Sequence, residues 1–457
     1  MRLTVDGIGK VTDTTVDLDG ITVVAGPNDT GKSTIGKALF ALVNSQHDFT
    51  NEFADRIAAQ LTQIAVRNAA GPGLDLRILE YVKTDLKTLF ADLRKRDGYG
   101  PDDVRDWFSG QRPSRSAGKD YESLCEWVAG DSPEAVEFRT KCVEYIGQDE
   151  SVVRRLFATQ EFQGVFDEQV NSRFSIGIST ASAGLEDDRW DFESTVEFKS
   201  DKCVTMESRL PERTAAILID DPQVVNDILK PQRDYFEVLF GYRNLAHMSI
   251  DEQNRDIVDS RSSVGMSKAM TDTQAEERSR IVQDILDVLG KGCDTRTRIV
   301  NGTPVMDSTD GLSEPIHLRN VSLGATSMVM LGYLLEHGIL DEDTFLILDE
   351  PEIHLHPEWQ LYYAETLVRC AKELGTRVLL TTHSPYFMHA LIIYSQYHRY
   401  DGLRIYAPEP SEKNPKCSTF RLADEERQNE LLESMAKPFD ILERIQIDMS
   451  LRKDQEE

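Results

Sequence analysis

The stretch TFLILDEPEIHLHP, from Thr344 to Pro357, restricts the fold of this chain more than any other. Its residues Phe345–Leu348 are an uninterrupted apolar run, which is typical of a strand buried on both faces of a parallel sheet. The run ends in two adjacent carboxylates, Asp349 and Glu350. Because open α/β sheets bind ligands at the carboxyl ends of their strands, these carboxylates are candidate site residues. Taken alone, the stretch also fits a buried strand followed by an acidic turn.

A glycine-rich loop near the N-terminus favours the first interpretation. Residues 26–33 read GPNDTGKS and match the phosphate-binding pattern G-x-x-x-x-G-K-[ST] in full. The loop lies between a predicted buried strand, Ile21–Ala25, and a predicted helix, Thr34–Leu42, which is the context that the pattern requires. Backbone N–H groups of such a loop converge on phosphates at a helix N-terminus. The two stretches together predict nucleotide hydrolysis on a P-loop sheet.

Individual residues of the loop receive roles from the same pattern. Lys32 is expected to reach the β and γ phosphates, and the Ser33 hydroxyl is expected to hold Mg²⁺. The predicted nucleotide-binding residues of the loop are Gly26, Pro27, Asn28, Asp29, Thr30, Gly31, Lys32, Ser33 and Thr34.

Composition limits the class of protein. The 457 residues suggest two or three structural units, and the formal charge of −28 disfavours a broad basic face that follows nucleic acid. The six cysteines are scattered without a C-x-x-C pair, which is typical of reduced thiols. The N-terminus lacks the pattern of a signal peptide, and no apolar run approaches the ~20 residues that span a bilayer. A cytoplasmic protein without a membrane partner is expected.

Apolar spacing indicates alternating helical and strand-rich segments. Residues three or four apart are apolar from about residue 46 and again from Val224, whereas residues 173–180, 191–200 and 202–209 alternate like strands. The expected segments are 1–45 (N-terminal part of the nucleotide-binding domain), 46–170 (helical insertion), 171–222 (β-strand part of that domain), 223–290 (second helical segment), 291–421 (C-terminal part of the domain) and 422–457 (C-terminal helical tail).

Three further features bear on the site. The run Thr214–Ile219 predicts a buried strand that ends in Asp220 and Asp221, and the run Arg377–Thr382 predicts one that ends in His383. Ser322 and Gly324 open a predicted helix and therefore mark a second anion site, separate in sequence from the glycine loop.

The order of these features resembles the ABC-type ATPase heads of the SMC, RecF and overcoming-lysogenization-defect (OLD) group. The motifs EPEIHLHP and TTHSP resemble those of the OLD-like "AAA family ATPases" of bacterial genomes in particular, and many of these ATPases belong to antiphage systems. The resemblance implies an α/β fold, a P-loop NTPase head of ABC type with a mixed sheet, an antiparallel β lobe and helical insertions. It also implies ATP and Mg²⁺ as the bound nucleotide and ion.

The resemblance implies a role for each matching position. Residues 26–33 are then the Walker A loop, and Asp349 and Glu350 end the Walker B strand, with Asp349 ordering Mg²⁺ and Glu350 activating water. Ser322 and Gly324 fall on the ABC signature, which contacts the γ-phosphate held by the opposite subunit. His383 matches the switch histidine, and residues 352–356 match the D-loop. The catalytic residues implied are Glu350, His383 and Lys32.

The chain departs from the family pattern at several points. Leu323 stands where a signature glycine is usual, which implies a looser contact between subunits and slower turnover. No Q-loop glutamine is identified, although Asp220 and Asp221 end a strand at a suitable place. The stretch after His383 lacks the acidic strand ends of the TOPRIM nuclease domain that OLD nucleases carry there, so a nuclease in this chain is not expected.

The histidines allow one alternative. His354, His356, His383 and His389 suggest a zinc site, but their spacing does not fit one helix face and no cysteine is near in sequence, which favours loop and switch roles.

The function expected is that of a dimeric ATPase switch, as a homodimer or higher even oligomer. Similarity to Septu- and PARIS-type systems implies a separate nuclease or toxin as its partner. Two other classes remain open from the sequence. One is a DNA-repair or recombination head of RecF or SMC kind that clamps DNA. The other is an ABC transporter subunit, which the long insertion and the motif EPEIHLHP both disfavour.

Overall fold

The computed structural model describes the chain except residues 48, 70–76, 111–117, 175–179, 188–191, 212, 222–271, 294–296, 301–302, 307–315 and 457. The chain forms two compact units. The first comprises Met1–His47 and Phe157–Glu457, and the second comprises Asp48–Leu156.

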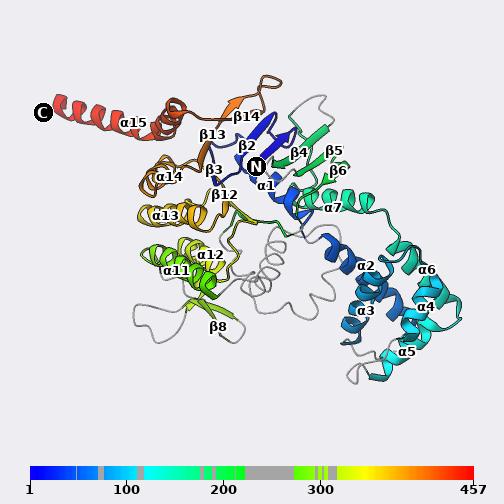
Figure 1. Ribbon diagram of the computed structural model, residues 1–457. Coiled ribbons are helices and arrows are strands. Elements are labelled where there is room, and N and C mark those ends of the chain that lie inside the picture. Colours follow the sequence, from blue (N-terminus) through cyan, green and yellow to red (C-terminus); the bar gives the residue numbers. More distant parts are fainter. Residues whose placement is uncertain are drawn as a thin grey trace. The chain divides into compact units, whose positions relative to one another are not determined.

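A six-stranded mixed sheet is the centre of the first unit (Figure 1). Its order is β14-β13-β3-β12-β11-β7, in which neighbouring strands from β13 to β7 run parallel and β14 is antiparallel to β13. The strands are β3 (Ile21–Ala25), β7 (Ala215–Ile219), β11 (Thr344–Asp349), β12 (Arg377–Thr382), β13 (Leu403–Pro410) and β14 (Ser418–Leu422). All residues of β3 and β7 are buried, which explains why their sequences are continuous apolar runs and do not alternate.

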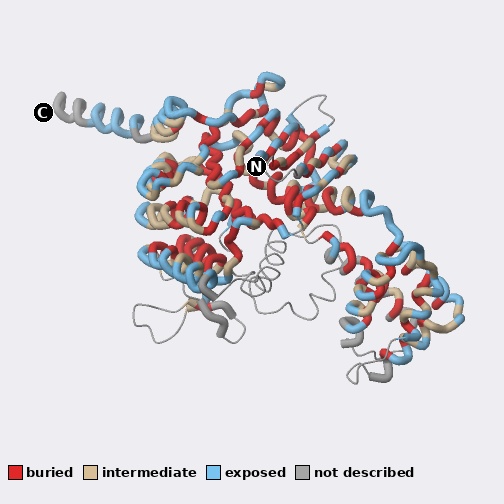
Figure 2. The backbone as a smooth tube through the Cα atoms, viewed as in Figure 1, coloured by how far each residue is buried: buried red, intermediate tan, exposed pale blue. Residues whose placement is uncertain are grey.

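Each face of this sheet has its own hydrophobic core. On one face Val24, Phe345 and Ile347 pack with α1 (Lys32–Asn44). On the other face Val23, Leu346 and Leu348 pack with four helices. These are α11 (Asp272–Leu289), α12 (Leu323–Glu336), α13 (Pro357–Glu373) and α14 (Pro385–Tyr397). Figure 2 shows the buried positions along these elements. The two cores fix the sheet from both sides, so the loops at its carboxyl edge have a rigid base.

A second, five-stranded sheet is antiparallel and shares the core that contains α1. Its order is β2-β1-β4-β5-β6. The strands are β1 (Arg2–Asp6), β2 (Thr14–Asp17), β4 (Thr180–Asp187), β5 (Phe192–Lys199) and β6 (Lys202–Ser208). In β1 the side chains alternate between exposed and buried, as expected for a sheet with one face in water.

Smaller elements complete the first unit. A three-stranded sheet consists of β8 (Thr297–Val300), β9 (Thr303–Met306) and β10 (Ile316–His317), and the short helix η3 (Leu318–Asn320) follows it. The C-terminal helix α15 (Glu425–Glu456) contacts α14 and β13.

The second unit is helical. It contains α2 (Phe49–Ala69), α3 (Arg77–Leu93), α4 (Pro101–Gly110), α5 (Gly118–Ala129) and α6 (Pro133–Ile146), and α7 (Glu150–Val165) begins in it and continues into the first unit. The apolar spacing at Phe53, Ile57 and Leu61 places these three side chains in its core. No helix in the part of the chain that the structure describes is long and apolar enough to cross a membrane.

The predicted α/β class is confirmed, with its mixed sheet and antiparallel lobe. The predicted strand at 173–180 lies mostly outside the described residues, whereas β4 occupies Thr180–Asp187, which the sequence pattern did not indicate. Most of the second predicted helical segment also lies outside them, and α11 forms its described end. The boundaries of the six segments stay predictions.

Candidate nucleotide-binding site

The glycine loop leads directly from β3 into α1, as the pattern predicts. Gly31 caps α1 with φ +91°, a left-handed conformation that a side chain would strain. Since glycine has no capping side chain, the N–H groups of the first helical turn remain available to an anion. The Lys32 ammonium is 4% exposed and donates to the carbonyl oxygens of Gly26 (3.1 Å) and Pro27 (3.0 Å). One nearly buried cation is thus fixed inside the loop.

The other loop residues hold the loop's shape. The Thr30 hydroxyl donates to the Pro27 carbonyl at 3.0 Å, and the Thr34 amide donates to the Gly31 carbonyl at 3.1 Å. Lys10, which the sequence pattern did not single out, donates to the Asp29 carbonyl at 3.2 Å and pairs with its carboxylate. Asn28 and Asp29 are exposed, and Asp29 has a left-handed backbone, φ +64°.

Asp349, the predicted Walker B carboxylate, contacts the glycine loop. Strand β12 lies between β3 and β11, and all three run parallel, so their carboxyl ends meet at one edge. There the Ser33 hydroxyl donates to Asp349 Oδ1 at 2.9 Å. The Thr381 hydroxyl donates to the same oxygen at 2.5 Å, because the register pairs Asp349 with Thr381. The structure therefore brings the two predicted Mg²⁺ ligands together.

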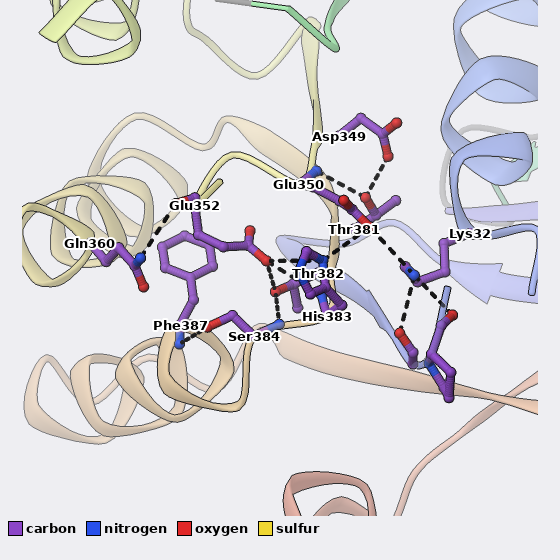
Figure 3. Close-up of polar contacts among 12 residues, drawn as sticks. Lys32, Asp349, Glu350, Glu352, Gln360, Thr381, Thr382, His383, Ser384 and Phe387 are labelled. Carbon is purple, nitrogen blue, oxygen red and sulfur yellow. Dashed lines mark hydrogen bonds and ion pairs between the residues drawn. The ribbon is translucent and has the colours of Figure 1, made fainter. Parts of the chain in front are cut away.

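Glu350 lies between a cation and an imidazole (Figure 3). Its Oε1 atom is 3.5 Å from the Lys32 ammonium and 3.2 Å from His383 Nδ1. The contact with His383 is a close approach without hydrogen-bond geometry. Glu350 has φ +49°, and its amide donates to the Thr381 carbonyl (3.2 Å) and hydroxyl (3.0 Å). All three predicted catalytic residues thus converge.

Asp220 lies beside this group. Strand β7 pairs with β11 so that Ile219 is opposite Leu348, and Asp220 follows at the edge next to Asp349. Burial raises the pKa of the Asp220 carboxyl, and the neighbouring Asp349 charge adds to the effect. Asp220, Asp349 and Glu350 line one pocket together with Ser327 and His354. The strand end that the sequence placed near a Q-loop position therefore borders the site.

The signature residues take part in a different set of contacts. Ser322 is exposed and caps α12, accepting a hydrogen bond from the Ala325 amide at 3.3 Å. Gly324 is buried against the turn that contains His354, since a Cβ atom there would lie 2.4 Å from the His354 carbonyl oxygen. Among the described residues, no hydrogen bond or ion pair joins Ser322 or Gly324 to Lys32. The roles of Ser322 and Gly324 at a nucleotide stay predictions.

Gly324→Ala is expected to lower the stability of the fold. The new methyl group meets backbone, which cannot rotate away, so the start of α12 or the turn that contains His354 must shift. Overpacking of this kind costs about 1–3 kcal/mol. Thermal unfolding measures the effect. Gly100→Ala is the control, because a Cβ atom there meets nothing within 4 Å. A parental melting temperature for Gly324→Ala contradicts this packing.

The oxygen ligands at the site suit magnesium. A hydroxyl and a carboxylate, Ser33 and Asp349, meet at the mouth of the phosphate loop, and Mg²⁺ prefers few carboxylates together with substrate phosphates. Across the described residues, no three His, Cys, Asp or Glu side chains gather into a metal-binding group. His354, His356, His383 and His389 accordingly form no such cluster.

Sequence patterns missed the residues that support the site. The Thr381 hydroxyl donates to Asp349 and accepts from the Glu350 amide. The Glu352 carboxylate accepts hydrogen bonds from the Thr382 hydroxyl and the His383 amide, and the Gln360 amide donates to the Glu352 carbonyl at 3.3 Å. The only available signal was their closeness to the carboxyl ends of β11 and β12. Their partners follow from strand register, which the sequence does not give.

Comparison with known proteins gives a family match in this region. Residues 223–388 match the protein-family model described as "AAA ATPase domain". The matched stretch contains Ser322, Asp349, Glu350 and His383, and it excludes the glycine loop. A search of curated proteins finds no match.

Solved structures that match this chain include three SMC heads. They include the Smc head bound to the C-winged helix domain of ScpA, with 10% identity over 93% of this chain and 98% of that chain and a TM-score of 0.43. The SMC head domain from Thermotoga maritima has 12% identity, 93% and 98% coverage and a TM-score of 0.37. A Smc head with an extended coiled coil, bound to the C-terminal domain of ScpA and derived from Pyrococcus furiosus, has 10% identity, 97% and 98% coverage and a TM-score of 0.41. At these identities and TM-scores, the likeness carries no inference about activity.

The matched stretch is similar to an AAA ATPase domain, and the glycine loop, Asp349 and Glu350 meet at one sheet edge in P-loop geometry.

Proposed function

We propose that the chain binds ATP with Mg²⁺ and hydrolyses it to ADP and phosphate at the edge formed by β3, β11 and β12. One observation carries the proposal: the Glu350 carboxylate contacts both the Lys32 ammonium of the phosphate loop and the His383 imidazole, beside the paired Ser33 and Asp349. A carboxylate in this place suits the activation of water next to a bound γ-phosphate.

Each side chain has a distinct task in this reaction. Lys32 and the loop amides stabilise negative charge on the phosphates. Glu350 accepts a proton from water while the water oxygen bonds to the γ-phosphorus and the bond from that phosphorus to the β-γ bridging oxygen breaks. Ser33 and Asp349 are the residues that would hold Mg²⁺, which when bound supplies charge neutralisation. The His383 imidazole lies next to the Glu350 carboxylate and helps to hold that carboxylate in place beside the attacking water.

The site is proposed to be completed by a second subunit. Ser322 is exposed at the N-terminus of α12, while the described contacts of Lys32 involve only its own loop and Glu350. A helix N-terminus is a ready anion site, and a two-fold dimer gives each subunit's Ser322 to its partner's nucleotide.

The wider role proposed is a switch in a bacterial antiphage defence system that controls a separate nuclease or toxin. The motifs EPEIHLHP and TTHSP support a defence role, because they resemble those of OLD-like ATPases. A DNA-clamping repair ATPase is the alternative, and the net charge of −28 stands against it.

Phosphate release by the purified chain tests the proposal. With ATP and Mg²⁺, inorganic phosphate is expected to accumulate linearly, and EDTA is expected to stop it because Ser33 and Asp349 then lack their ion. Absence of phosphate release at every protein concentration tested, with ATP binding intact, contradicts hydrolysis by this chain alone.

A further inference from the structure

Glu352 is a buried carboxylate that has no role in the proposed reaction. It follows Glu350 by two residues, in the turn after β11, and is 3% exposed. Burial raises the pKa of its carboxyl group, and the hydrogen bond from Thr382 opposes that effect. Burying a carboxylate is costly unless its interactions compensate, so its presence here requires a reason.

One oxygen of Glu352 holds the segment that carries His383 (Figure 3). Oε1 accepts hydrogen bonds from the Thr382 hydroxyl at 2.5 Å and from the His383 amide at 3.3 Å. The same Thr382 hydroxyl oxygen accepts a hydrogen bond from the Ser384 amide at 3.0 Å. The carboxylate therefore fixes the backbone at the point where the chain leaves β12 and turns into α14.

The carboxylate also faces the imidazole. Glu352 Oε1 is 3.9 Å from His383 Nδ1, the atom that lies 3.2 Å from Glu350 Oε1. The other oxygen, Oε2, is buried without a hydrogen-bond partner in the described chain. An uncharged acceptor would be enough to fill the space and to accept the two hydrogen bonds that Oε1 receives. The buried second oxygen, Oε2, therefore indicates that the negative charge itself has a role.

We propose that Glu352 is the positioning residue for His383: its carboxylate fixes the backbone and faces the ring, and so directs the imidazole toward Glu350. The inference deepens the proposed ATPase function and rests on it for its kinetic consequence. The statement that Glu352 orients the His383 ring concerns the chain without nucleotide, and it does not depend on ATP hydrolysis. Metal-binding histidines are commonly oriented by a second carboxylate, and removal of such outer partners typically costs about 10–100-fold; we expect an effect at the lower end of that range here, because no hydrogen bond in the described chain joins the Glu352 carboxylate to the ring.

Glu352→Gln is the sharpest variant, since glutamine keeps the shape and an acceptor oxygen but removes the negative charge. Its kcat is expected to fall roughly 10-fold with little change in KM. In a chain that already carries His383→Gln, adding Glu352→Gln is expected to leave kcat unchanged, because Glu352 acts through His383. Glu365→Gln is the matched control: Glu365 pairs with a different histidine, His398, at 3.1 Å, outside the site.

A spectroscopic measurement makes the test independent of ATP hydrolysis. The ¹⁵N ring resonances of His383 in the nucleotide-free chain, assigned by their loss in His383→Gln, are expected to shift in Glu352→Gln and to stay in place in Glu365→Gln. If the chain proves not to hydrolyse ATP, these resonances alone decide whether Glu352 orients the ring.

Three results overturn the inference. One is unchanged His383 ring resonances in Glu352→Gln. A second is a parental kcat in a chain whose hydrolysis is established. The third is an equal loss of kcat with and without His383, together with a lowered melting temperature, which marks Glu352 as a structural residue only.

Discussion

Glu350→Gln is expected to keep ATP binding and to lower the rate of hydrolysis by about 10²–10⁴-fold, the range typical of loss of a general base. Glutamine has nearly the same shape and keeps an oxygen near Lys32, but it does not accept the proton of the attacking water. The nucleotide-bound form should therefore accumulate. Phosphate release measures the rate, and calorimetric titration measures ATP affinity.

The control for this substitution is Glu365→Gln, which removes a carboxylate paired with His398 and should leave the rate unchanged. Hydrolysis by Glu350→Gln at the parental rate means that another group activates the water. Loss of ATP binding in this variant means that Glu350 serves mainly as the charge partner of Lys32.

Two inactive variants are expected to restore activity when mixed. Lys32→Ala removes the cation of the phosphate loop, and Ser322→Arg places a large charged side chain at the start of α12. If each site combines one subunit's Lys32 with its partner's Ser322, a mixed dimer has one site with both defects and one with neither. At equal mixing, about a quarter of the parental activity should return in a two-fold dimer with independent sites.

Ser322→Ala separates the effect of bulk from the loss of the helix cap, which alone costs about 1 kcal/mol. A mixture as inactive as its components, in a sample shown to contain heterodimers, argues against a site shared between subunits. Activity of Ser322→Arg alone leads to the same conclusion.

The parts of the fold that the sequence predicted share one physical cause. Strands β3, β7, β11 and β12 are buried on both faces, so they appear as apolar runs followed by a glycine, a carboxylate or a histidine. The glycine loop was equally clear, because close approach to phosphates restricts it to particular residue types. By contrast, β4 has the sequence TASAGLED, whose small residues give little alternation to detect.

The order of the strands and the partners of each side chain were beyond sequence reasoning. Glu352 and Thr382 are 30 residues apart, and they meet because β11 and β12 are neighbours with Asp349 opposite Thr381. Likewise, nothing in VSLGA indicates that Gly324 packs on the His354 carbonyl. Register and tertiary packing determine such contacts, whereas local patterns determine only which residues lie at strand ends.

ATP affinity of the parental chain and of Lys32→Ala is the measurement that most directly tests the nucleotide site. Lys32 is the buried cation of the loop, and a hydrogen bond to a charged group contributes about 1.5–3 kcal/mol, so calorimetric titration should show affinity weakened by about 10–100-fold. Lys372→Ala, a lysine on α13 that donates to the His398 carbonyl, should bind ATP as the parent does. Equal ATP affinity for the parent and Lys32→Ala would show that the glycine loop is not where this chain holds a nucleotide.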